Sequence, residues 1–210
     1  MAKKYFRKVY SQTDLLGSEQ DIIDRIDFIN EYSPLIPSLV TTSIWENGTN
    51  YEYKQPFIRK KSFRKHNKSF LVNKLENLAR DLNQITDCGF VHGDLNMKNI
   101  LFDGKNFSIV DLEPSLFQIK NKMKQLMMTP PYWSFNDIQN NTVSTESDKI
   151  GFFCFCCRVF NNKFFIKNRI GLTKKRQKEF VEFLPISENK IVSMKYDDLL
   201  WQSSMICKYN

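Results

Sequence analysis

The amino-acid sequence predicts an α+β protein, and three observations indicate this class. Two dipeptides that favour tight hairpin turns, Asn47-Gly48 and Asp103-Gly104, each lie between short runs rich in β-branched and aromatic residues. Between residues 71 and 85, leucine and isoleucine recur every three or four positions, the spacing of an amphipathic helix. Two later segments, Ile150–Phe160 and Lys174–Phe183, have helical character, so the C-terminal part should be mainly helical.

The composition indicates one folded domain over residues 1–210. Apolar residues make up 41% and aromatic residues 14% of the chain, proportions too high for a disordered protein. The longest apolar run, Ile150–Cys157, is far shorter than the roughly 18 residues of a membrane helix, and the first residues lack an apolar signal segment. We therefore expect a cytoplasmic protein without a membrane span.

The net charge of +8 would attract partners that carry phosphate groups. Its basic residues are spread over several segments and do not form one surface of interleaved basic and aromatic residues, so they indicate a solvated surface and do not favour nucleic acid as a partner. Cys154, Cys156 and Cys157 lie in a phenylalanine-rich stretch without paired C-x-x-C motifs. They are predicted to be buried free thiols.

The N-terminal segment predicts a strand followed by a helix. Tyr5–Tyr10 has the composition of a strand, whose two-residue period places Lys8 on one face with Phe6 and Tyr10. Isoleucines recur at helical spacing over Ser18–Asn30, and this helix should end before Pro34.

Two hairpins and a long helix are predicted next. Leu39–Glu46 and Thr49–Gln55 flank Asn47-Gly48 and should pair antiparallel. A helix from Ser69 should end at Gly89, a residue type common just beyond helix C-termini. Ile100–Phe102 and Phe107–Val110 then form the second hairpin around Asp103-Gly104.

The string His92-Gly93-Asp94, followed by Asn99, is the most informative motif in the sequence. It is rare by chance, since the chain has two histidines and seven glycines, and it lies between the long helix and the second hairpin. Because that hairpin folds back on itself, Asn99 before one strand and Asp111 after the other should reach the same end. A hard cation such as Mg²⁺ takes such oxygen ligands together with substrate phosphates, which leaves Asp94 to accept a hydroxyl proton. This division of roles is typical of phosphoryl transfer.

The sequence His92-Gly93-Asp94-Leu95-Asn96-Met97-Lys98-Asn99, followed by Ile109-Val110-Asp111-Leu112-Glu113, resembles the catalytic and metal-binding loops of the protein-kinase-like superfamily. Thr129-Pro130-Pro131-Tyr132 is similar to the end of a protein-kinase activation segment. Ser147–Gly151 resembles the start of the helix whose aspartate, here Asp148, holds the catalytic loop. The similarity extends from residue 4 to about residue 160.

This resemblance implies a bilobal protein-kinase-like fold, with a shortened N-terminal β-lobe over residues 1–56 and a mainly helical C-terminal lobe over 57–210. The implied cofactors are ATP and Mg²⁺. Asp94 would be the catalytic base, Asn99 and Asp111 the Mg²⁺ ligands, and Lys8 the contact to the α- and β-phosphates. His92 would brace the catalytic loop.

The resemblance also implies further contacts to the nucleotide. Backbone groups of Glu52, Tyr53 and Lys54 would receive adenine. An acidic residue on the Ser18–Asn30 helix would pair with Lys8, with Asp24 favoured and Glu19 as the alternative.

The sequence departs from the kinase pattern at the phosphate-covering loop and at the metal-binding triplet. No G-x-G-x-x-G loop precedes Lys8, so other groups cover the phosphates, ATP binds weakly, or a protein partner completes the site. Asp111-Leu112-Glu113 lacks the usual glycine, and Glu113 is a candidate extra ligand. Gly93 replaces the usual arginine, as in aminoglycoside, choline and lipopolysaccharide sugar kinases.

We therefore expect an ATP- and Mg²⁺-dependent phosphotransferase with a hydroxyl acceptor. The Thr129–Tyr132 segment favours a protein serine or threonine as acceptor, whereas His92-Gly93-Asp94 favours a sugar or another small molecule. A nucleotide-binding pseudokinase scaffold is the third interpretation.

Overall fold

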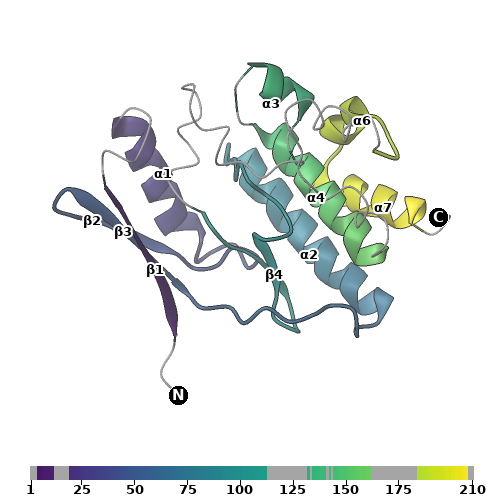
Figure 1. Ribbon diagram of the computed structural model, residues 1–210, viewed down its shortest axis with the longest axis horizontal. Helices are drawn as coiled ribbons and strands as arrows, with labels where there is room; N and C mark the ends of the chain where they lie inside the picture. The colour runs from purple at the N-terminus through teal and green to yellow at the C-terminus, as the bar shows by residue number, and fades with distance from the viewer. Residues whose placement is uncertain are drawn as a thin grey trace, which may run out of the picture.

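The computed structural model describes residues 4–11, 19–112, 132, 134–140, 142, 144–161 and 184–207. These residues form a mixed α+β structure, with a three-stranded sheet and one helix at one side, a small hairpin in the middle and a group of helices at the other side (Figure 1). Within these ranges, no helix combines the length and apolar character needed to cross a bilayer. The predicted helix Lys174–Phe183, Glu113 and Thr129–Pro131 lie outside the described residues.

The larger sheet contains β1 (Tyr5–Ser11), β2 (Ser43–Asn47) and β3 (Asn50–Pro56) in the order β1-β3-β2. All of its pairs are antiparallel, and the register places Lys8 opposite Tyr53. Gly48, in the turn between β2 and β3, has φ of +63°, as a two-residue hairpin turn of this kind requires. The predicted N-terminal strand and first hairpin turn are therefore confirmed.

The prediction that Leu39–Thr42 belongs to this hairpin is wrong. Instead, Leu39 forms a parallel bridge with Ile109, where the Ile109 amide donates to the Ser38 carbonyl and the Val40 amide to the Ile109 carbonyl. The Ser38 amide also donates to the buried carboxylate of Asp81 at 2.8 Å. These contacts hold the segment against the long helix and the second hairpin, so it joins the two halves of the fold.

Helix α1 (Glu19–Tyr32) packs beside the larger sheet, and its isoleucines at positions 22, 26 and 29 are buried (Figure 1). The side chain of Asn30 fastens it to β2, because it donates to the carbonyl and accepts from the amide of Ile44, both at 2.8 Å. The helix predicted over Ser18–Asn30 is confirmed for the residues that the structure describes.

Helix α2 (Lys68–Asp87) is the long helix that the leucine and isoleucine spacing predicts. Asn67 caps its start by accepting from the Ser69 amide at 2.9 Å. At its end Gly89 has φ of +82°, and the Phe90 amide donates to the Ile85 carbonyl at 3.0 Å. This left-handed glycine with a six-to-one hydrogen bond is a Schellman motif, and it turns the chain into the loop that follows.

The second hairpin consists of β4 (Ile100–Phe102) and β5 (Phe107–Ile109), as predicted. Helices α3 (Phe135–Asn140), α4 (Thr145–Phe160), α6 (Glu188–Ser193) and α7 (Tyr196–Ile206) follow, and α2, α4 and α7 pack side by side (Figure 1). The cysteines of α4 are free and buried, which confirms that prediction. Burial of α4 over residues 147–157 makes it the central helix of this half.

Candidate functional site

The loop between α2 and β4 brings Asp94 and Asn99 together. The side-chain nitrogen of Asn99 donates to the backbone carbonyl of Asp94 at 2.9 Å and to its carboxylate at 3.1 Å. Asn99 is buried, whereas Asp94 remains half-buried and so retains access to solvent. These two hydrogen bonds orient the Asp94 carboxylate beside Asn99.

Asp148, near the start of α4, holds the beginning of this loop. Its two carboxylate oxygens accept from the amides of His92 and Gly93, at 2.7 and 2.9 Å. Burial raises the pKa of Asp148 to about 7, while these amides and the nearby Arg25 favour the charged form. Gly93 has φ of +83°, a conformation that favours glycine. This backbone conformation is the reason for a glycine between His92 and Asp94. The expected structural role of Asp148 agrees with this geometry.

His92 is completely enclosed and links the loop to the second hairpin. Its Nε2 atom lies 2.9 Å from the Val110 carbonyl, and its Nδ1 atom lies 3.2 Å from the Asp94 amide. These two contacts require Nε2 to donate and Nδ1 to accept, which is the pattern of a neutral ring. Burial lowers its pKa to about 4, in agreement with that tautomer. His92 is therefore a positioning residue for Asp94.

Helix α4 also supports the loop through its backbone. A Cβ atom at Gly151 would lie 1.7 Å from the Leu95 carbonyl oxygen, so the glycine allows the helix and the loop to touch. Leu95 itself is buried, directly after Asp94. The loop thus rests on the central helix at both Asp148 and Gly151.

Asn99 and Asp111 lie at the same end of the second hairpin, as predicted. The Val110 amide donates to the Asn99 carbonyl at 2.9 Å, which extends the ladder by one pair beyond Ile100 and Ile109. Their amide and carboxylate oxygens are the donor types that Mg²⁺ takes together with phosphate oxygens. Among the residues that the structure describes, no cluster of three or more His, Cys, Asp or Glu side chains could hold a metal ion. A Mg²⁺ ion at Asn99 and Asp111 would therefore need phosphate oxygens of a bound nucleotide as further ligands.

Lys8 reaches across from the larger sheet to Asp111. Its Nζ atom lies 3.4 Å from the Asp111 carboxylate, although the two residues are 103 positions apart in the sequence. Their side chains remain 30% and 35% exposed, so a ligand in solvent can reach both. The phenols of Tyr10 and Tyr53 lie close by, and burial together with the Asp111 charge raises the pKa of each above its ordinary value. Both phenols are therefore neutral at this site.

Two predicted groups of site residues are not placed as expected. Asp24 is exposed on α1, accepts from Gln20 at 2.7 Å and makes no ion pair with Lys8, both being described residues. Its side chain points away because the sheet-facing positions of α1 are occupied by isoleucine. The side chain of Glu19, the alternative, lies outside the described part of the chain.

Glu52, Tyr53 and Lys54 belong to β3, the central strand of its sheet. Their backbone groups face β1 on one side and β2 on the other, so they are used in the sheet and are unsuited to receive adenine. The predicted adenine contact at these three residues is therefore corrected: a central strand has no open edge.

Arg25 is a site residue that the sequence interpretation missed. It is 1% exposed, stacks over the Phe90 ring at 3.9 Å, and donates to the Val91 carbonyl at 2.9 Å. It thereby joins α1 to the chain directly before His92. The signal was available, because position 25 lies on the same helical face as Ile22 and Ile29, where a charged residue is unexpected.

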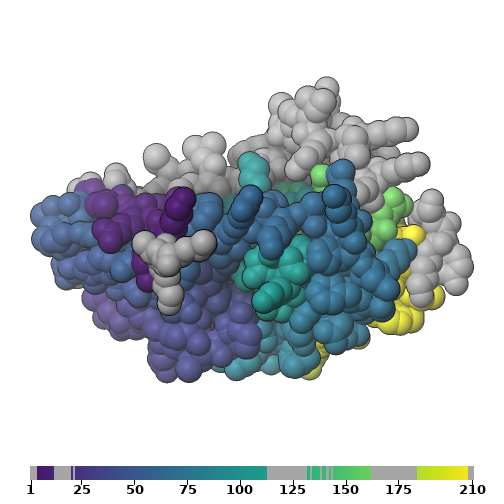
Figure 2. Space-filling model, turned by 90° about the horizontal axis from the view of Figure 1, so that it is seen from below, coloured from purple at the N-terminus to yellow at the C-terminus, as the bar shows by residue number. Residues whose placement is uncertain are grey.

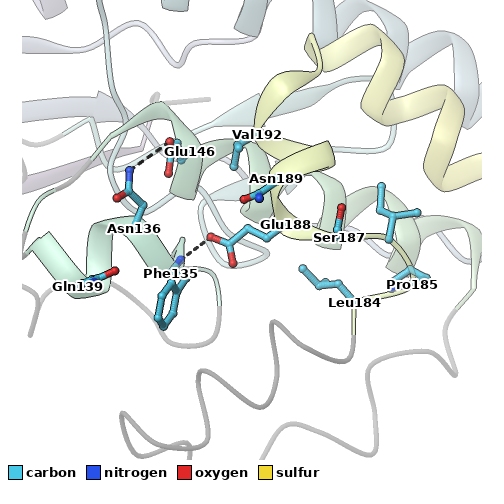
Figure 3. Close-up of a pocket in the computed structure, with 11 residues that line it drawn as sticks. Phe135, Asn136, Gln139, Glu146, Leu184, Pro185, Ser187, Glu188, Asn189 and Val192 are labelled. Carbon is cyan, nitrogen blue, oxygen red and sulfur yellow. Dashed lines mark hydrogen bonds between the residues drawn. The ribbon is translucent and has the colours of Figure 1, made fainter.

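One cavity in the described part of the chain is lined by no residue of this loop. It has a volume of about 770 Å³ and lies between α3, the first turn of α4 and the segment that leads into α6 (Figure 3). Asn136 donates to Glu146, and the Phe135 amide donates to Glu188, across its wall (Figure 3). The carboxylates of Glu146 and Glu188 therefore have a structural role, because each accepts a hydrogen bond from α3.

No model of a known protein family matches the chain, and no curated protein is significantly similar to it in sequence. Function must therefore be inferred from the residues of the site.

Proposed function

We propose that the protein is an ATP- and Mg²⁺-dependent phosphotransferase with a protein-kinase-like fold, which transfers the γ-phosphoryl group to a hydroxyl acceptor. The observation that carries this proposal is the ion pair between Lys8 and Asp111, because it brings a cation of the first sheet to the expected metal ligand of the second hairpin. Asp94 and Asn99 complete the set on the neighbouring loop.

Each residue has a separate role in the proposed reaction. Asp94 orients the acceptor hydroxyl and accepts its proton while the acceptor oxygen bonds to the γ-phosphorus; the bond from phosphorus to the β-phosphate oxygen breaks, and ADP leaves. The Lys8 ammonium offsets negative charge on the phosphates. Asn99 and Asp111 would hold Mg²⁺, which when bound supplies positive charge beside the phosphate oxygens.

The fold supports this proposal. Residues from the sheet and from the hairpin meet at one place, and Arg25 and the segment 38–40 connect the two halves behind it. The Asp94 loop is also rigidly held, by Asp148, His92 and Gly151. Preorganised groups of this kind are what phosphoryl transfer requires of a protein.

The test is incubation of the purified protein with γ-labelled ATP and Mg²⁺, following label in protein and in released phosphate. Wild type should turn over ATP, and Asp111→Asn should reduce turnover by about 10²-fold or more because the metal loses a charged ligand. Asp198→Asn, on the exposed surface of α7, is the matched control and should match wild type. Equal turnover by the Asp111 variant would contradict the proposal.

A nucleotide-binding pseudokinase is the second candidate. The observation in its favour is that Lys8 already neutralises Asp111, while the residues described supply no further carboxylate cluster for a metal ion. Asp94→Asn distinguishes the two functions: an enzyme should lose turnover and keep the rise in Tm caused by ATP, whereas a pseudokinase should show the rise in Tm and no turnover in either form.

A further inference from the structure

A second cavity, of about 390 Å³, lies beside the proposed active site. Its walls are the connector that leads from β3 to α2, the β4–β5 hairpin, and the last turns of α4. The connector runs along the hairpin, since the Lys61 amide donates to the Phe102 carbonyl at 2.7 Å. Figure 2 views this side of the molecule, where the teal surface of the hairpin is flanked by the blue surface of the residues that precede and form α2.

The cavity is strongly basic, and we call it the basic pocket. Its five cationic residues are Lys60, Lys61, Arg64, Lys98 and Arg158, and none of its described lining residues is acidic. Asp103, next to the pocket, interacts electrostatically with Lys61 and compensates part of this charge. The described lining of the pocket is therefore cationic, with Arg64 and Lys98 exposed at its edge, which favours an anion in a partly enclosed site.

The floor of the basic pocket is aromatic and rigid. The buried rings of Phe102, Phe107 and Phe155 pack against one another, with ring centroids 4.9 and 5.4 Å apart. Phe63 covers them and is only half-buried. A ligand in this pocket would thus meet cationic groups at the rim and an apolar surface below.

The pocket shares residues with the loop that carries Asp94. Met97 and Lys98 line the pocket, and the Lys60 ammonium donates to the Met97 carbonyl at 3.2 Å. The Asn99 amide donates to the Asn96 carbonyl at 3.0 Å, so this part of the loop is a tight turn. Lys98 follows Asp94 by four residues, which places the two backbones within roughly 10 Å of each other.

We propose that the basic pocket binds the anionic group of the acceptor, and that the acceptor is a small hydroxyl compound that also carries a phosphate. This inference rests on the proposed phosphotransferase function. One molecule would place its hydroxyl at Asp94 and its phosphate among Arg64, Lys98 and Lys60. The volume of the pocket suits the compact phosphate end of such a molecule, whereas an acidic peptide would need a longer groove.

The experiment measures binding of glycerol 3-phosphate by isothermal titration calorimetry at physiological ionic strength, with glycerol as the uncharged comparison. The variants are Arg64→Glu and Lys98→Glu. Lys65→Glu is the matched control, because it makes the same charge change at an exposed neighbour of Arg64 that does not line the pocket. We expect glycerol 3-phosphate to bind wild type and the control alike, each pocket variant to bind it at least about tenfold more weakly, and glycerol not to bind. Circular dichroism verifies that each variant is folded.

Three results would overturn the inference. Glycerol 3-phosphate could fail to bind wild type, it could bind all four proteins equally, or an acidic peptide without phosphate could bind more tightly in the same Arg64-dependent way. The ATP turnover assay with Asp111→Asn tests the phosphotransferase function separately. Arg64-dependent binding without ATP turnover would refute that function and leave an anion site, whereas turnover without Arg64-dependent binding would refute the pocket alone.

Discussion

Replacing Gly151 by alanine should destabilise the protein, although the same change in an exposed helix is stabilising. Gly151 lies inside α4, where a change from glycine to alanine ordinarily adds about 1 kcal/mol of stability. Here the added Cβ atom would lie 1.7 Å from the Leu95 carbonyl oxygen and 2.9 Å from its carbonyl carbon. Both atoms belong to the backbone and cannot rotate away.

The size of the effect follows from this contact. Since Cβ atoms essentially never approach another atom within 3.0 Å, the helix and the loop must separate by at least about 1.3 Å. Overpacking of a core costs about 1–3 kcal/mol, and a collision between two backbones belongs at the upper end. After the gain in helix propensity, a net loss of about 2 kcal/mol remains, which lowers the Tm of a chain of this length by roughly 4–8 °C.

Thermal unfolding followed by circular dichroism measures the loss. Asn73→Ala, at an exposed position inside α2, is the control for helix propensity and should change stability by less than about 0.5 kcal/mol. Backbone amide chemical shifts of residues 92–99 report the displacement of the loop. This displacement should also reduce the proposed ATP turnover, because shifts of about 1 Å near reacting groups cost about 10²-fold.

A Gly151→Ala protein that unfolds at or above the wild-type temperature would refute this reasoning. Unchanged amide shifts in the loop would do the same, since they would mean that the α4 backbone does not touch Leu95.

Three further predictions concern the groups that hold the site. Burial lowers the pKa of His92 from 6.5 to about 4, so the folded state disfavours the protonated ring. As the pH falls from 6.5 to 4, His92 therefore lowers the free energy of unfolding by up to ~3 kcal/mol. An NMR titration of the His92 ring should find its midpoint near pH 4 and not near pH 6.5. The Asp148 carboxyl, with a pKa raised to about 7, acts in the opposite direction over this range, so the two titrations are to be followed individually. Asp148→Ala leaves two buried amides without their acceptor and should cost about 2–4 kcal/mol in urea unfolding; a loss below about 1 kcal/mol would contradict the observed hydrogen bonds. Asp81→Ala removes the acceptor of the Ser38 amide and should cost about 1–3 kcal/mol, whereas Asp87→Ala, exposed at the end of the same helix, should have little effect.

The features that the sequence predicted correctly depend on local chemistry. Asn47-Gly48 and Asp103-Gly104 located both hairpin turns, and the second turn fixed Asn99 and Asp111 at one end of their hairpin. The two-residue alternation of the first strand placed Lys8 on one face with Phe6 and Tyr10, and in the structure Lys8 contacts Asp111. Each of these inferences needs only a few neighbouring residues and a regular backbone.

The features that it predicted wrongly depend on contacts between distant segments. Leu39 pairs with Ile109 because the long helix and the hairpin meet there. The residue pattern of segment 39–46 alone does not predict a contact with a residue so far along the chain. β3 is the central strand because β1, from the start of the chain, pairs with the edge of β3 that the β2–β3 hairpin leaves open. The backbone groups of Tyr53 are therefore used in the sheet. Arg25 could have been noticed as a charge on an apolar face, but its partner Val91 is 66 residues away.

The attachment of the Asp94 loop to α4 has a consequence for hydrogen exchange. The amides of His92 and Gly93 donate to a carboxylate that is itself buried in the central helix, so they can exchange with solvent only when the loop detaches from α4. Loops commonly exchange at low opening free energies, whereas core helices exchange close to the free energy of global unfolding. The amides of this loop should therefore be as slow as those of α4, and the loop should open as part of the same cooperative unit as the helix beneath it.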